Sequence, residues 1–192
     1  TLAEFAAAMR KEPDRKSPEI PIGLWQNSGD FIDGFCTERV CRALAGKKHI
    51  PFSRLAGADY SGMKSKEIPL TLYKAQYCKG TIPNFRAYLE ADTYPHTRFF
   101  TAACQIISLI ALGLSFGFEG VIFHTMQQFD NPNEETAYGK AYKREKKRLD
   151  EVFRMVRNDS LHGVGIPYDP SRYAKQGALD RPFWLESVAR FG

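Results

Sequence analysis

Polar side chains of several kinds gather within the short stretch from Phe85 to Phe99. A brief apolar segment is followed there by two carboxylates, an imidazole and a guanidinium, from Glu90, Asp92, His96 and Arg98. Carboxylates beside cationic or titratable groups suit general acid–base or glycosyl-transfer chemistry. Ligands of β/α proteins bind at the carboxyl ends of strands, where this cluster falls. The stretch therefore predicts a functional site more strongly than a plain loop.

Each of these side chains also has a structural interpretation. Glu90 and Asp92 would share one face of a continuing strand, and one of them could simply pair with Arg98. Asp92 could instead cap the helix that follows. His96 and His124 could each satisfy a loop carbonyl. The sequence alone leaves these alternatives open.

Residues that suit a sugar-like ligand also follow the other predicted strands. Aromatic faces stack on pyranose rings, and amides and carboxylates match hydroxyl groups. The groups are Trp25, Gln26 and Asn27 after the first strand, Arg54, Asp59 and Tyr60 after the second, and His124, Thr125 and Gln127 after the fourth. Trp25 is predicted at the mouth of the site, with a core position as the alternative.

The sequence predicts neither a metal site nor a cofactor. Its four histidines are scattered, and its four cysteines form no Cys-x-x-Cys pair. It contains no Gly-rich phosphate loop, no serine nucleophile elbow and no His-Glu-x-x-His pattern. Cys36 and Cys104 fall on predicted apolar helix faces, which favours free structural thiols and a reducing compartment.

Charge and length exclude several classes of protein. Much of the net charge of +5 in these 192 residues comes from Lys140 to Arg148, which is typical of the solvated face of a helix. We therefore expect no nucleic-acid partner. Glu4 interrupts the N-terminal segment, so no signal peptide is predicted, and we expect a cytoplasmic protein. The uncharged run from Phe99 to Phe118 is long enough to cross a membrane, but its polar and glycine residues favour a buried helix.

Short apolar segments alternate with helical patterns along the chain, which predicts a parallel sheet covered by helices. The predicted strands are 20–25, 50–56, 85–89 and 120–124, and the predicted helices are 2–10, 33–46, 69–80, 97–114 and 134–157. Pro13 is expected to close the first helix, and Gly46 to cap the second in a left-handed conformation. We expect the last helix to turn inward Tyr142, Leu149, Val152, Phe153 and Val156.

A family resemblance rests on the run from Glu90 to Phe99, which reads Glu-Ala-Asp-Thr-Tyr-Pro-His-Thr-Arg-Phe. With Gly117-Phe-Glu-Gly120, this run resembles the late part of a (β/α)8 glycoside hydrolase. More particularly, it resembles poorly characterised bacterial proteins related to β-galactosidase-like barrels, in which a Glu-x-Asp-Thr-x-Pro-x-x-Arg stretch ends one strand. Weaker similarities extend the likeness over about Pro21 to Arg157.

The resemblance implies that residues 1–160 form strands five to eight of a (β/α)8 barrel, and that 161–192 is an exit segment or linker. Glu90 then stands where glycosidases of this fold carry their nucleophile, at the end of strand seven. The acid/base partner would precede Thr1, so the isolated chain is expected to be inactive. Asp92, His96 and Arg98 would orient or polarise the nucleophile. The remaining sugar-subsite residues would be Trp25, Asn27, Asp59, Tyr60 and His124.

Two other classes of protein fit the same pattern. One is a catalytically silent carbohydrate-binding or scaffold barrel, in which Glu90 only accepts hydrogen bonds. The other is an open-sheet α/β domain with an unrelated small ligand. For both the glycosidase barrel and the silent barrel, one expected partner is a carbohydrate. The other is the missing half of the barrel or a second copy, because a half-barrel leaves two sheet edges open.

Overall fold

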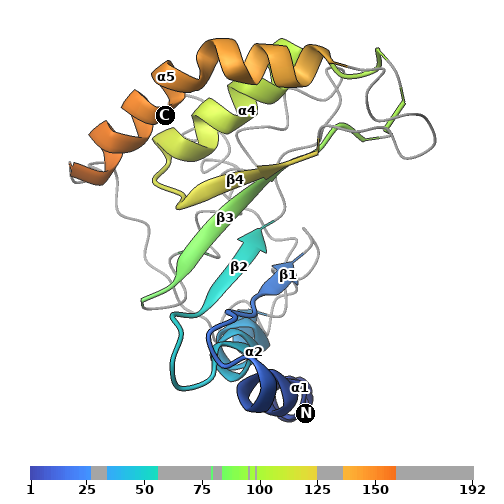
Figure 1. Cartoon of the computed structure of the whole chain (residues 1–192), viewed down its shortest axis with the longest axis vertical. Coiled ribbons are helices and arrows are strands. Elements are labelled where there is room, and N and C mark those ends of the chain that lie inside the picture. Colours follow the sequence, from blue (N-terminus) through green and yellow to red (C-terminus); the bar gives the residue numbers. More distant parts are fainter. Residues whose placement is uncertain are drawn as a thin grey trace, which may run out of the picture. The chain divides into compact units, whose positions relative to one another are not determined.

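The computed structural model describes residues 1–26, 34–55, 79, 84–94, 96–97, 99–124 and 136–158. Four parallel strands form a sheet in the order β1-β2-β3-β4, and helices accompany them (Figure 1). The strands are β1 (Leu24–Gln26), β2 (Phe52–Leu55), β3 (Arg86–Ala91) and β4 (Gly120–Phe123), and the helices are α1 (Leu2–Lys16), α2 (Gly34–Ala45), α4 (Ala103–Ser115) and α5 (Ala137–Asn158). The predicted α/β class with a parallel sheet is confirmed.

The chain divides into two compact units. The first comprises residues 1–56, 73–87 and 165–192, and the second comprises 57–72 and 88–164. The predicted helix 69–80 lies outside the described residues except for Lys79, which is helical, and segment 161–192 lies wholly outside them.

In the first unit, α1 packs on α2, and α2 contacts both β1 and β2. The apolar contacts centre on Ala6, Val40 and Leu44. The first helix begins with a capping box in which the Thr1 hydroxyl accepts a hydrogen bond from the Glu4 amide. Gly46 ends α2 with a φ of 66°, as the sequence predicted.

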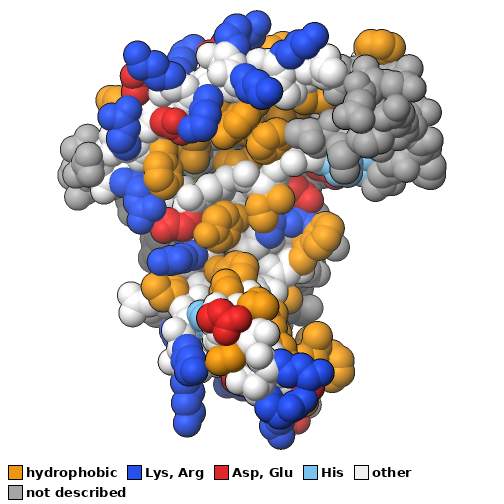
Figure 2. All heavy atoms as spheres, in the orientation of Figure 1, with side chains coloured by type: hydrophobic (Ala, Val, Ile, Leu, Met, Phe, Trp, Pro, Cys, Tyr) orange, Lys and Arg blue, Asp and Glu red, His pale blue; other side chains and the backbone are white. Residues whose placement is uncertain are grey.

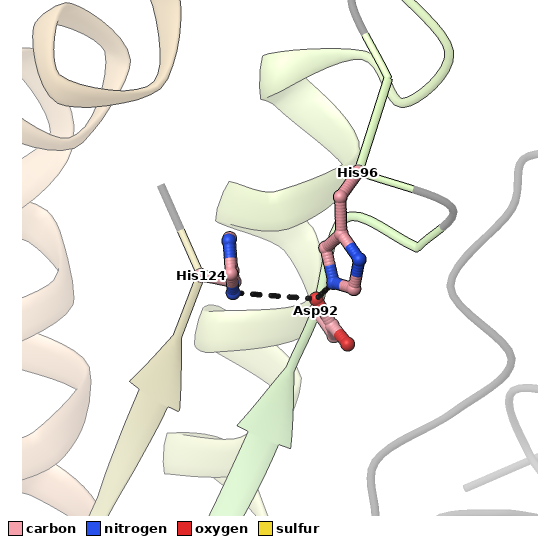
Figure 3. A group of neighbouring side chains, drawn as sticks. All are labelled: Asp92, His96 and His124. Atoms are coloured by element: carbon pink, nitrogen blue, oxygen red, sulfur yellow. Dashed lines mark hydrogen bonds and ion pairs between the residues drawn. The ribbon is translucent and has the colours of Figure 1, made fainter. Parts of the chain in front are cut away.

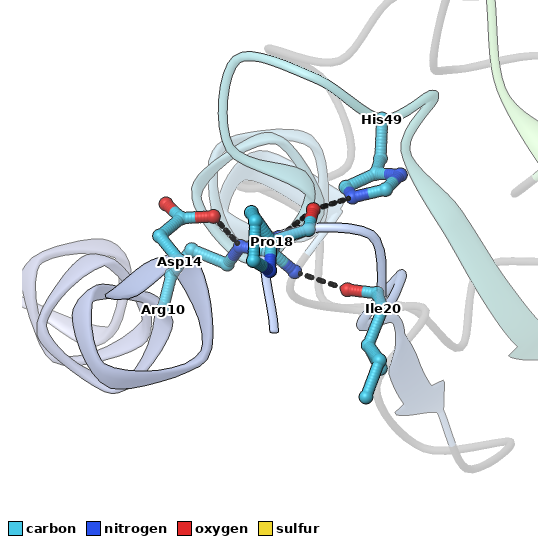
Figure 4. A network of polar contacts seen from close by, with 5 residues as sticks. All are labelled: Arg10, Asp14, Pro18, Ile20 and His49. Carbon is cyan, nitrogen blue, oxygen red and sulfur yellow. Dashed lines mark hydrogen bonds and ion pairs between the residues drawn. The ribbon is translucent and has the colours of Figure 1, made fainter. Parts of the chain in front are cut away.

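The prediction that Pro13 closes the first helix is wrong, because α1 continues through it to Lys16. Polar contacts hold this extra turn (Figure 4). Nε of the buried Arg10 donates to Asp14 Oδ1 at 2.7 Å, and its Nη1 donates to the Ile20 carbonyl at 2.8 Å. The His49 Nε2 lies 2.8 Å from the Pro18 carbonyl. These contacts stabilise the turn after the proline, where a hydrogen bond to a charged group contributes about 1.5–3 kcal/mol.

In the second unit, α4 covers one face of β3 and β4, and α5 packs on α4 (Figure 1). Leu89 and Ala91 are fully buried, whereas Tyr88 and Glu90 are half-buried. Gly113 of α4 brings the helix so close to the sheet that an added Cβ would lie 2.8 Å from Val121. The buried core residues of this unit are Ala91, Ile106, Leu109, Ile110, Leu114, Tyr138 and Leu149.

Several predicted boundaries differ from the structure. The strand β3 runs two residues further than expected and includes Glu90, since its parallel ladder with β4 continues to Ala91. The helix α4 starts at Ala103 instead of Thr97. Phe99 has a φ of 61° and Ala102 is extended, so the backbone of this segment is not helical. The strands β1 and β2 are shorter than predicted, because Ile20 to Gly23 and Ile50 to Pro51 are not strand.

The basic run on α5 is exposed, as expected for a solvated helix face, and Figure 2 shows Lys and Arg side chains gathered over this helix. On its other side, Leu149 is buried and Tyr142, Val152 and Phe153 pack against the core. Among the described helices, none combines the length and the apolar character needed to cross a bilayer.

Candidate functional site

The site is built on the face of β3 and β4 opposite α4, called here the distal face. Side chains alternate across a strand, so the burial of Leu89 and Ala91 against α4 turns their neighbours the other way. Glu90 pairs in register with Ile122, which is 54% exposed. The expectation that Glu90 and Asp92 share a face is consistent with this alternation. The distal face thus carries Tyr88, Glu90, Asp92, Ile122 and His124.

Asp92 and His124 are neighbours at the carboxyl edge because each directly follows one of the two paired strands (Figure 3). The last registered pair is Ala91 with Phe123, and the His124 amide donates to the Ala91 carbonyl at 3.0 Å. The ladder therefore fixes both backbones just beyond the strands. The Asp92 Oδ1 lies 3.9 Å from His124 Nδ1.

A tight turn brings His96 back to the same carboxylate. The His96 amide donates to the Thr93 carbonyl at 2.8 Å, and His96 itself has a φ of 62°, a left-handed conformation that histidine adopts more often than most residues. Its Nε2 lies 2.6 Å from Asp92 Oδ1. His96 therefore pairs with a carboxylate, and not with a loop carbonyl through this nitrogen.

Asp92 is held on one oxygen by two partners, His96 Nε2 and the Thr93 amide at 2.7 Å. Its predicted alternative role as a helix cap is wrong, since the N-cap of α4 is Ala102. The two imidazole rings lie with their centroids 4.5 Å apart, and Tyr94 contacts the edge of His96. Asp92 thus lies close to two histidines that follow different strands of the sheet.

His124 has unused hydrogen-bonding capacity. Its Nε2 is buried and has no hydrogen-bond partner among the described residues. A separation of 3.9 Å between its Nδ1 and Asp92 is too long for a hydrogen bond. Buried polar atoms of this kind are rare in folded proteins, so each needs an explanation.

The other predicted site residues belong to the first unit or are undescribed. Trp25 belongs to the first unit and is 70% exposed, which excludes the core position for its ring. The Arg54 guanidinium carbon lies 4.1 Å from the centre of that ring, a cation–π contact between registered partners of β1 and β2. Six predicted residues lie outside the described part of the chain, namely Asn27, Asp59, Tyr60, Arg98, Thr125 and Gln127.

The three-residue cluster itself was not predicted as a unit. One potential ligand atom each from Asp92, His96 and His124 lies within 4.8 Å of the others. The Asp-x-x-x-His spacing was visible in the sequence, but the proximity of His124 depends on which strands pair and in what register. Comparison of the chain with family models, with curated proteins and with solved structures found no match.

Proposed function

We propose that this chain is part of a glycoside hydrolase of the (β/α)8 type, with Glu90 as the nucleophile of a retaining mechanism. The observation that supports the proposal best is the position of Glu90 on the distal face of β3, two residues before the carboxyl edge. The helices of a (β/α)8 barrel cover the outer face of its sheet, and ligands bind at the carboxyl edge of the strands. In such a barrel, β3 would present the Glu90 carboxylate where a sugar would lie.

The sequential order of the four parallel strands supports the barrel part of the proposal. Neighbouring strands of a (β/α)8 barrel follow each other in sequence, as β1 to β4 do here. In this interpretation they are strands five to eight, and the acid/base carboxylate comes from another part of the barrel. Asp92 and His96 would then position the sugar or Glu90, since the Asp92 carboxylate is already bound by two donors.

The test is covalent trapping of the nucleophile in the full-length protein with fluorinated glycosides that carry an activated leaving group. An activated group departs without protonation, so trapping needs the nucleophile but not the acid/base residue. We expect one glycosyl adduct on the peptide that contains Glu90. The substitution Glu90→Gln should abolish the adduct and reduce hydrolysis of aryl glycosides about a thousandfold or more, which is about 4 kcal/mol of barrier.

The matched control is Glu119→Gln, because Glu119 belongs to the same unit but pairs with Arg157 of α5 at 3.0 Å. This variant should retain both the adduct and the activity. An adduct on another residue, or full turnover by Glu90→Gln, would overturn the role of Glu90. Sugar binding without any adduct would favour the catalytically silent carbohydrate-binding barrel.

A further inference from the structure

We infer that Asp92, His96 and His124 form a binding site for a divalent transition-metal ion of the zinc type. The Asp92 Oδ1 lies 2.6 Å from His96 Nε2 and 3.9 Å from His124 Nδ1 (Figure 3). A tetrahedral zinc ion about 2.1 Å from each ligand holds neighbouring ligand atoms about 3.4 Å apart. The two observed separations lie on either side of this value, so small rotations of the side chains bring all three atoms into range.

The environment of His124 is the second observation that points to an ion. The His124 Nε2 is buried and has no hydrogen-bond partner among the described residues, while Nδ1, the nitrogen that faces Asp92, lies 3.9 Å from its Oδ1 and is too far away for a hydrogen bond. Ligation through Nδ1 would give this nitrogen a strong partner. It would also hold together two imidazoles whose ring centroids lie 4.5 Å apart.

The donor atoms select the kind of ion. Two imidazole nitrogens and one carboxylate oxygen are the ligands of catalytic zinc sites and of other borderline divalent metals. Magnesium and calcium prefer sites made of oxygen atoms alone. The site therefore favours zinc, cobalt or iron(II) over the hard cations.

The site is accessible enough for an ion and a substrate. The side chains of His96, Asp92 and His124 are 13%, 17% and 32% exposed, so none is sealed in the core. Three protein ligands leave at least one coordination position for water, which the ion would activate as a nucleophile or replace with a substrate oxygen. Because a retaining glycosidase needs no metal, this inference goes beyond the proposed function and does not depend on it.

The inference can be tested by titrating the full chain with zinc in a calorimeter and with cobalt in a spectrophotometer. We expect one ion per chain and a cobalt absorption spectrum typical of nitrogen and oxygen ligands without thiolate. Changes to residues that only contact a metal ligand weaken metal binding by about 10–100-fold. The variants His96→Asn and His124→Gln remove ligands themselves, so each should weaken zinc binding by more than this. Asparagine is chosen at position 96 because it tolerates the left-handed backbone there.

The matched control is His49→Gln, which removes a histidine of the first unit that contacts the Pro18 carbonyl. It should leave zinc affinity unchanged. Thermal unfolding without added metal checks that each variant folds, and zinc should raise the melting temperature of the wild type and of the control but not of the two site variants. Absence of stoichiometric binding to the wild type, or equal affinity in folded His96→Asn and His124→Gln, would overturn the inference.

Discussion

Burial changes the chemistry of single side chains, and the cysteines show the effect clearly. Cys41 is completely buried in α2, and this burial raises the pKa of its thiol from 9.0 to about 12. Cys104 was predicted on an apolar face of its helix, but it is exposed at the start of α4. The apolar residues around it in the sequence therefore did not determine its own orientation.

The raised pKa of Cys41 predicts how stability changes in alkali. Above about pH 9 the thiol ionises in the unfolded chain but stays protonated in the folded one. This ionisation stabilises the unfolded state, so the free energy of unfolding falls as the pH rises. The loss should reach about 1.4 kcal/mol per pH unit between about pH 9 and pH 12. Urea denaturation across this range should show a steeper decline for the wild type than for Cys41→Ala.

The control for this experiment is Cys104→Ala, which removes an exposed thiol and should decline as the wild type does. The difference between the two variants cancels the titration of lysines and tyrosines elsewhere in the chain. If the free energy of unfolding declined equally in the wild type and in Cys41→Ala, the raised pKa of the Cys41 thiol would be contradicted.

At the scale of elements, the close contact of α4 with the sheet depends on Gly113. An alanine there would place its Cβ 2.8 Å from Val121 Cγ2 and 2.9 Å from Leu89 Cδ2. Overpacking of a core costs about 1–3 kcal/mol, while alanine in a helix gains about 0.5–1 kcal/mol over glycine. We therefore expect Gly113→Ala to lower the free energy of unfolding by about 1–2 kcal/mol in chemical denaturation.

Gly139 of α5 provides the matched comparison, because an added Cβ meets nothing within 4 Å there. Only the gain in helix propensity applies, so Gly139→Ala should raise the free energy of unfolding by about 0.5 kcal/mol. A similar effect of both substitutions would show that the packing of α4 against β3 and β4 does not limit residue size.

The order and type of the described elements were predictable, because the apolar pattern changes period along the chain. The sequence did not predict that α1 passes through Pro13, since Arg10 is positioned there partly by the carbonyl of Ile20, which lies beyond the end of the helix. It also did not predict the start of α4, because the left-handed Phe99 is not marked by a glycine.

The site was predicted only in part, because one of its residues comes from a distant part of the sequence. Glu90, Asp92 and His96 are close in sequence, so a local pattern revealed them. His124 joins them only through the pairing of β3 with β4, which is a long-range property of the chain. The role of Trp25 in a sugar site stays a prediction, and its contact with Arg54 was not foreseen.

At the scale of the whole molecule, the described residues include two apolar core clusters that share no residue. One contains Leu109 and the other contains Leu44. Truncation of a buried leucine costs about 2–5 kcal/mol. If each unit opens by itself, Leu109→Ala should reduce the hydrogen-exchange protection of α4 and α5 while leaving α1 and α2 protected. Leu44→Ala should do the reverse, and a uniform loss of protection in both variants would indicate one cooperative unit.

The pairing of Ala91 with Phe123 restricts which insertions and deletions the sequence can accept during evolution. A residue gained or lost within β4 would turn His124 to the opposite face of the sheet and separate it from Asp92, because side chains alternate along a strand. Descendants of this gene that keep the site must therefore keep the number of residues in β4. The connection before the strand, 116–119, is restricted in a different way, because Phe118 within it is buried and the Phe118 amide donates to the Gly113 carbonyl at 3.2 Å.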